Sequence, residues 1–71
     1  MVVRMTPEAK RMVNFLASAG PYANTTADKS DTHDILLETG GCLLSGGRLY
    51  NIVSRHLGAG VYRLSLELAN P

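Results

Sequence analysis

Few residues in this sequence have the side chains needed for metal or nucleophilic chemistry. The strong nitrogen and sulfur ligands are Cys42, His33 and His56, and they lack the close pairing that is typical of zinc sites. Cys42 with either histidine could form a nucleophile pair, but a lone cysteine in an apolar run usually belongs to the core. The sequence therefore predicts a protein that is not an enzyme, with no catalytic residue, no metal and no cofactor.

Three aspartates, Asp28, Asp31 and Asp34, form the densest acidic group. They lack the alternating oxygen ligands and the closing glutamate of a calcium loop, so helix capping explains them better. The segment 41–48, GCLLSGGR, approaches the phosphate-loop pattern but lacks its lysine and its hydroxyl residue. Turn glycines before a helix are the favoured interpretation, with an anion held by backbone donors and Arg48 as the alternative.

The polar residues of 48–57 are the strongest candidates for a binding surface. They are residue types that contact phosphates, base edges or a protein partner. The candidate partner-binding residues are Arg48, Tyr50, Asn51, Ser54 and Arg55. Further contacts to phosphate or to an acidic partner are predicted for Lys10, Arg11 and Arg63. The alternative is an ordinary solvated helix face.

These candidates depend on the structure of 48–57 and of the segment after it. Leu49, Ile52, Val53 and Leu57 have the three-and-four spacing of one helical face, which predicts a helix that Gly58 ends. Residues 61–68 alternate apolar and polar side chains, which predicts a half-buried strand. The alternative is that 48–57 is also a strand, in a meander with glycine turns at 46–47 and 58–60.

The rest of the chain supplies two more helices. Thr6-Pro7-Glu8 predicts the start of the first helix, which Gly20-Pro21 ends. Polar residues follow, and we expect a flexible loop over about 21–31. A second short helix should begin at 31–34 and end at Gly40, although its apolar run 35–37 could instead be a strand. Residues 42–44 are expected to be a buried connector, and 1–5 a short strand paired with 61–68.

The predicted fold is therefore a single small α+β domain over 1–71, with about three helices, a short N-terminal strand and a C-terminal strand that pairs with it antiparallel. The sheet could also be completed across a homodimer through strand 61–68. A domain of this size buries only about 60% of the surface of its unfolded chain, so a partner would stabilise it. The single cysteine, and the lack of a signal peptide or a long apolar run, predict a cytoplasmic protein that does not enter membranes.

Two functions are compatible with these observations. The first is a small non-catalytic protein that occupies or sequesters a macromolecular protein partner, as phage and mobile-element inhibitors such as anti-CRISPR proteins and antitoxins do. The second is a small regulator resembling a helix-turn-helix protein, which would bind DNA through the polar face of helix 48–57. The net charge of +1 gives no general attraction to nucleic acid, so we favour the first.

Overall fold

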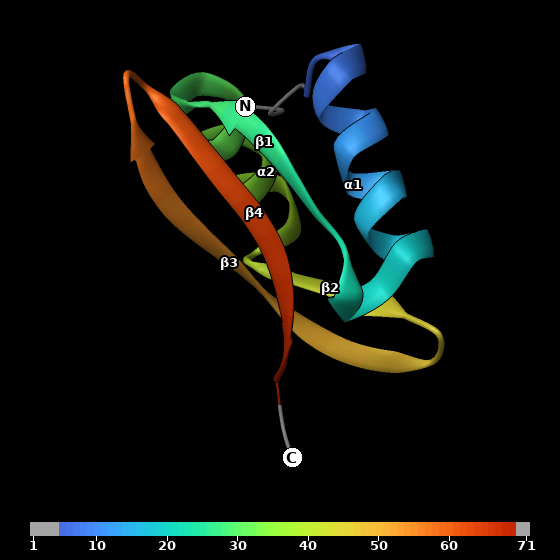
Figure 1. The fold of residues 1–71 in the computed structure, drawn as a ribbon. Coiled ribbons are helices and arrows are strands. Elements are labelled where there is room, and N and C mark those ends of the chain that lie inside the picture. The colour runs from blue at the N-terminus through green and yellow to red at the C-terminus, as the bar shows by residue number, and fades with distance from the viewer. Residues whose placement is uncertain (1–4, 70–71) are drawn as a thin grey trace.

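The computed structural model describes residues 5–69 and shows two helices packed on one four-stranded sheet (Figure 1). The elements are α1 (Pro7–Ala19), the short 3-10 helix η1 (Gly20–Tyr22), β1 (Asn24–Asp28), α2 (Lys29–Thr39), β2 (Cys42–Ser45), β3 (Arg48–Gly58) and β4 (Val61–Leu68). The strands lie in the order β1-β4-β3-β2, and each neighbouring pair is antiparallel. The sheet therefore has two edge strands, β1 and β2, around the long β3–β4 hairpin.

The first helix and the last strand are confirmed. Thr6 caps α1 because its hydroxyl accepts a hydrogen bond of 3.0 Å from the Ala9 N–H, and Pro7 occupies the first turn. Gly20, with a φ of 77°, ends the helix. In β4 the alternation holds, because Leu64 and Leu66 are buried while Arg63 and Glu67 are exposed.

The predicted fold of three helices and two strands is wrong. Residues 48–57 form strand β3 rather than a helix, and the sheet has four strands. Of the supposed helical face, Ile52 points to the core and Leu49 and Val53 lie on the other face of the strand, while Leu57 lies in the register shift between His56 and Gly58. The glycine turns at 46–47 and 58–60 instead join consecutive strands, as in the meander alternative.

Two segments that were assigned no regular structure also belong to the sheet. The predicted flexible loop, about 21–31, contains all of β1 and the beginning of α2, and the predicted connector 42–44 lies in β2. β1 has only Ala27 as a buried apolar residue, so its composition resembles that of a surface loop. It becomes a strand because its backbone pairs with β4, from Asn24 opposite Ser65 to Asp28 opposite Val61.

Strand β4 is paired on both sides, with β1 on one and β3 on the other. The predicted N-terminal strand lies mostly outside the described residues, and Met5, the part that is described, is not in a strand. A homodimer through the whole of 61–68 would need a free edge on β4, whereas β1 pairs with Val61–Ser65 and leaves only 66–68 without a described strand on that side. Within the described part of the chain, the longest stretch of strand without a neighbour lies on β3, because β2 pairs only with Arg48–Asn51.

The core lies between the helices and one face of the sheet. Its buried apolar side chains come from both helices and from three of the strands: Ala9, Leu16, Ala27, Ile35, Tyr50, Ile52, Leu64 and Leu66. Ser45 connects β2 to α1, because its hydroxyl donates a 2.7 Å hydrogen bond to the Ala17 carbonyl. The opposite face of the sheet carries no helix of the described chain, and we call it the open face (Figure 1).

Candidate functional site: the open face of the sheet

The open face is defined by the register of the four strands. Side chains alternate between the two faces, and Tyr50, Ile52, Leu64 and Leu66 point to the core, so the residues between them point away from it. The open face therefore carries Asn24, Thr26 and Asp28 of β1, Val61, Arg63, Ser65 and Glu67 of β4, Leu49, Asn51, Val53 and Arg55 of β3, and Cys42 and Leu44 of β2. Most of these side chains are polar, which keeps this face compatible with water.

Arg55 and Arg63 lie directly opposite each other at the distal part of this face. Both are exposed, and Thr26 is the next residue in the same row, opposite Arg63 on its other side. Like charges at directly opposite positions destabilise a sheet. The single ion pair found among the described residues joins His33 and Asp34, so neither arginine has a described carboxylate within 4.0 Å. The pair therefore presents two positive charges to solvent, neither of them in an ion pair with a described residue.

Exposed apolar side chains lie on either side of this arginine pair. At the β2–β3 end, Leu44 and Leu49 are opposite each other and are 67% and 49% exposed. At the β3–β4 turn, Leu57 and Val61 are also exposed. A surface that combines arginines with exposed aliphatic side chains has the composition of a protein interface more than of a phosphate-binding surface, where basic residues dominate.

The structure separates the five predicted partner-binding residues of 48–57. Asn51 and Arg55 lie on the open face, whereas Arg48, Tyr50 and Ser54 have the opposite orientation. Tyr50 is 8% exposed and belongs to the core, so it cannot form part of a surface site. The five residues were grouped by the spacing of a helix, and side chains on a strand do not follow that spacing.

The three additional basic candidates are also separated. Arg63 joins Arg55 on the open face. Lys10 and Arg11 are exposed on α1, and Arg11 lines a hollow between α1 and β1 with Phe15 and Thr25.

Thr26 and Ser65, the polar neighbours of the arginine pair, were missed. Their position follows from the pairing of β1 with β4, and no periodicity within 21–31 signals it.

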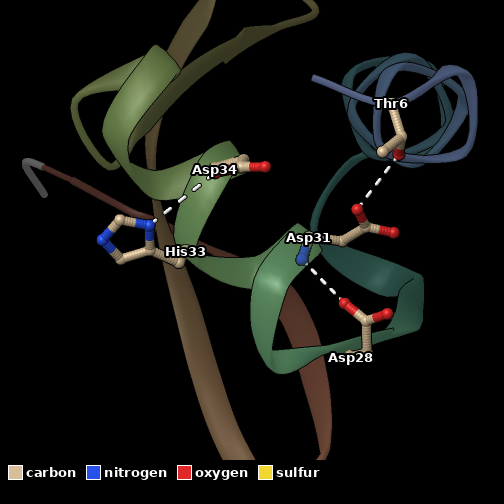
Figure 2. A network of polar contacts seen from close by, with 5 residues as sticks. All are labelled: Thr6, Asp28, Asp31, His33 and Asp34. Atoms are coloured by element: carbon tan, nitrogen blue, oxygen red, sulfur yellow. Dashed lines mark hydrogen bonds and ion pairs between the residues drawn. The ribbon is translucent and has the colours of Figure 1, made fainter. Parts of the chain in front are cut away.

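The three aspartates have structural roles around the helix starts (Figure 2). Asp28 caps α2, because its carboxylate accepts a 2.7 Å hydrogen bond from the Asp31 N–H. The Asp31 carboxylate, in a residue only 7% exposed, accepts a 3.0 Å hydrogen bond from the Thr6 hydroxyl. Asp34 pairs with His33 at 3.7 Å. Helix capping therefore explains Asp28, and the contact between the helices explains Asp31.

The other candidates for chemistry are dispersed. His33 lies on α2, while His56 stacks on Tyr62 in the β3–β4 hairpin with ring centroids 4.7 Å apart. The Cys42 thiol is 3.6 Å from the Asn51 side-chain oxygen on the open face. Within residues 5–69, no three His, Cys, Asp or Glu side chains are grouped so that they could hold a metal ion.

Comparisons of this chain with protein-family models, with curated proteins and with solved structures found no match. Any function must therefore be argued from the geometry described above. Among residues 5–69, no helix has the length and apolar composition required to cross a membrane.

Proposed function

We propose that this protein is a non-catalytic binding module that occupies an acidic surface of a protein partner through the open face of its sheet. The observation that carries the proposal is the cross-strand pair of Arg55 and Arg63, two exposed like charges at opposite positions without a described carboxylate beside them. A partner carboxylate would relieve the repulsion within the pair, and two guanidinium groups can hold carboxylates through paired hydrogen bonds.

The rest of the open face favours a protein over nucleic acid as the partner. Arg55 and Arg63 are its only basic residues among those described, and two acidic residues, Asp28 and Glu67, lie on the same face. Proteins that bind duplex DNA tightly commonly contact several phosphates, and this face offers two cations. The exposed Leu44, Leu49 and Leu57 would gain from burial against a protein surface.

A regulator that reads DNA with helix 48–57 is not carried forward, because this segment is strand β3. The proposed mode of action is occupancy, in which binding hides an acidic surface that the partner needs. Small inhibitors and antitoxins, the class of protein predicted from the sequence, act in this way. It requires no group that makes or breaks covalent bonds.

The test compares two charge-matched double variants in affinity capture from host cells, with and without nuclease, followed by mass spectrometry. Arg55→Ala with Arg63→Ala should lose the captured protein. Lys10→Ala with Arg11→Ala removes the same charge from α1 and should retain it. Circular dichroism would verify that both variants fold. Equal capture by both variants, or a captured species that disappears with nuclease, would overturn the proposal.

A further inference from the structure

The edge of β3 beyond its pairing with β2 presents backbone groups that pair with no other residue of 5–69. The last described bond on this side runs from the Ile52 N–H to the Gly41 carbonyl, at 2.8 Å. Because backbone groups in a strand alternate in direction, the N–H and C=O of Ser54 and His56 point to the same side as those of Ile52. No strand lies there among the described residues, since β2 begins at Cys42, opposite Asn51.

This segment, 53–58, which we call the distal edge, lacks most of the features that protect sheet edges. Natural edges are blunted by proline, by lysine, by bulges or by a covering element. The distal edge contains neither proline nor lysine, its one charged side chain is Arg55, and its register shift lies only at its far end, between His56 and Gly58. Residues 54–58 are all exposed. The distal edge can therefore accept another strand by hydrogen bonding of the backbone.

The positive charge of Arg55 determines which kind of strand can pair with the distal edge. An added strand would lie about 4.8 Å from β3, with every second side chain on the open face beside Arg55. An acidic side chain at such a position would neutralise Arg55 and could reach toward Arg63. A second copy that paired through the same edge would bring another Arg55 close to the first, which adds repulsion. A strand from an acidic partner is therefore favoured over self-pairing.

We propose that the distal edge of β3 binds an extended acidic segment of the protein partner, which joins the sheet as a fifth strand with its carboxylates on the open face beside Arg55. This inference rests on the proposed function and specifies how the partner is held. The backbone hydrogen bonds of Ser54 and His56 would supply affinity, and Arg55 and Arg63 would select acidic sequences.

The experiment uses a short capped peptide in which glutamate alternates with valine, added to the full chain at millimolar concentration. Amide hydrogen exchange by NMR should show protection of Ser54 and His56 by about tenfold or more, which corresponds to about 1.4 kcal/mol. The control is the same peptide with N-methyl groups on the amides that would face β3, which retains the charge but cannot pair. It should give no protection.

A pair of variants tests the same edge from the protein side. Ser54→Pro removes an N–H that points away from β4, so the sheet keeps its internal hydrogen bonds and the peptide should bind about tenfold more weakly. Ser54→Thr retains the N–H and should bind like the wild-type chain. Circular dichroism would verify that both fold.

The outcomes separate this inference from the proposed function. If the N-methylated peptide binds as well as the unmodified one, and Arg55→Ala weakens both, the open face binds acidic partners but the strand addition is wrong. If neither peptide shifts any amide resonance, both proposals fail. Protection of Ser54 and His56 that rises with protein concentration in the absence of peptide would show that a second copy occupies the edge, and would overturn the acidic strand.

Discussion

Arg55 of β3 and Arg63 of β4 lie directly opposite each other on the open face, with Thr26 of β1 next in the row. The backbone N–H and C=O groups of Arg55 point toward β4, and those of Arg63 point toward β3. The two residues therefore form a hydrogen-bonded pair, whose Cα atoms lie about 5.5 Å apart. Two positive side chains are thus held together by the sheet. The fold tolerates a local repulsion that a threonine or valine at either position would remove.

Removing one member of this pair should stabilise the free protein. Arg55→Thr replaces a repelled charge with a residue that suits strands, and we expect the free energy of unfolding to rise by about 0.5 kcal/mol at low salt. The gain should shrink at high salt, where the repulsion in the wild-type chain is screened. Urea unfolding at both salt concentrations measures it. Arg48→Thr, a charge removed opposite Ser45, is the control and should show no such salt dependence.

The hydrogen bond between Thr6 and Asp31 should stabilise the packing of α1 against α2. Thr6→Val removes the hydroxyl that both caps α1 and donates to the nearly buried Asp31. We expect a loss of about 1 to 3 kcal/mol, because a cap is lost and a buried acceptor is left without its donor. Thr6→Ser keeps the hydroxyl and should lose much less, as measured by urea unfolding. An equal loss in both variants would instead assign the effect to packing of the Thr6 methyl group.

Leu64 should be the most sensitive position of β4. Its side chain is fully buried, and Leu64→Ala should lower the free energy of unfolding by about 2 to 5 kcal/mol. A chain of this length is stabilised by only about 4 to 11 kcal/mol, so a large fraction of the stability is lost. Leu44→Ala, on the open face, should change stability by less than about 0.5 kcal/mol. Thermal unfolding followed by circular dichroism distinguishes them, and similar midpoints would contradict the assignment of faces.

In the β3–β4 turn, Ala59 has a backbone conformation that is unfavourable for alanine. Ala59 has a φ of 52°, in the left-handed region that glycine adopts readily. Ala59→Gly should therefore raise the free energy of unfolding by about 0.5 kcal/mol, after the greater freedom of glycine in the unfolded chain is taken into account. Gly60→Ala, at a φ of 73° with open space around a Cβ atom, should lower it by about 1 kcal/mol. Urea unfolding tests the pair, and a loss in Ala59→Gly would contradict the strain.

The open face shows how much of a binding site can be predicted from one sequence. Asn51, Arg55 and Arg63 were identified as surface residues, and they do lie on that face. Tyr50 and Ser54 were grouped with them because a helical period places all five residues of 48–57 on one side, and a strand does not. Thr26 was not considered, because its place beside Arg63 depends on pairing between residues far apart in the chain.

The sequence by itself determined the elements whose signals are local. These are α1, with its Thr6 cap and its end at Gly20, the end of α2 at Gly40, and the alternating strand β4. Tertiary structure decided β1 and β3. β1 has too few apolar residues to be recognised as a strand from its sequence. The distal half of β3 extends beyond β2 and the core, so its exposed residues do not continue the alternation that begins at Tyr50 and Ile52. Both are strands because the backbone groups of β4 require partners on both sides, and that pairing is what places Arg55 opposite Arg63.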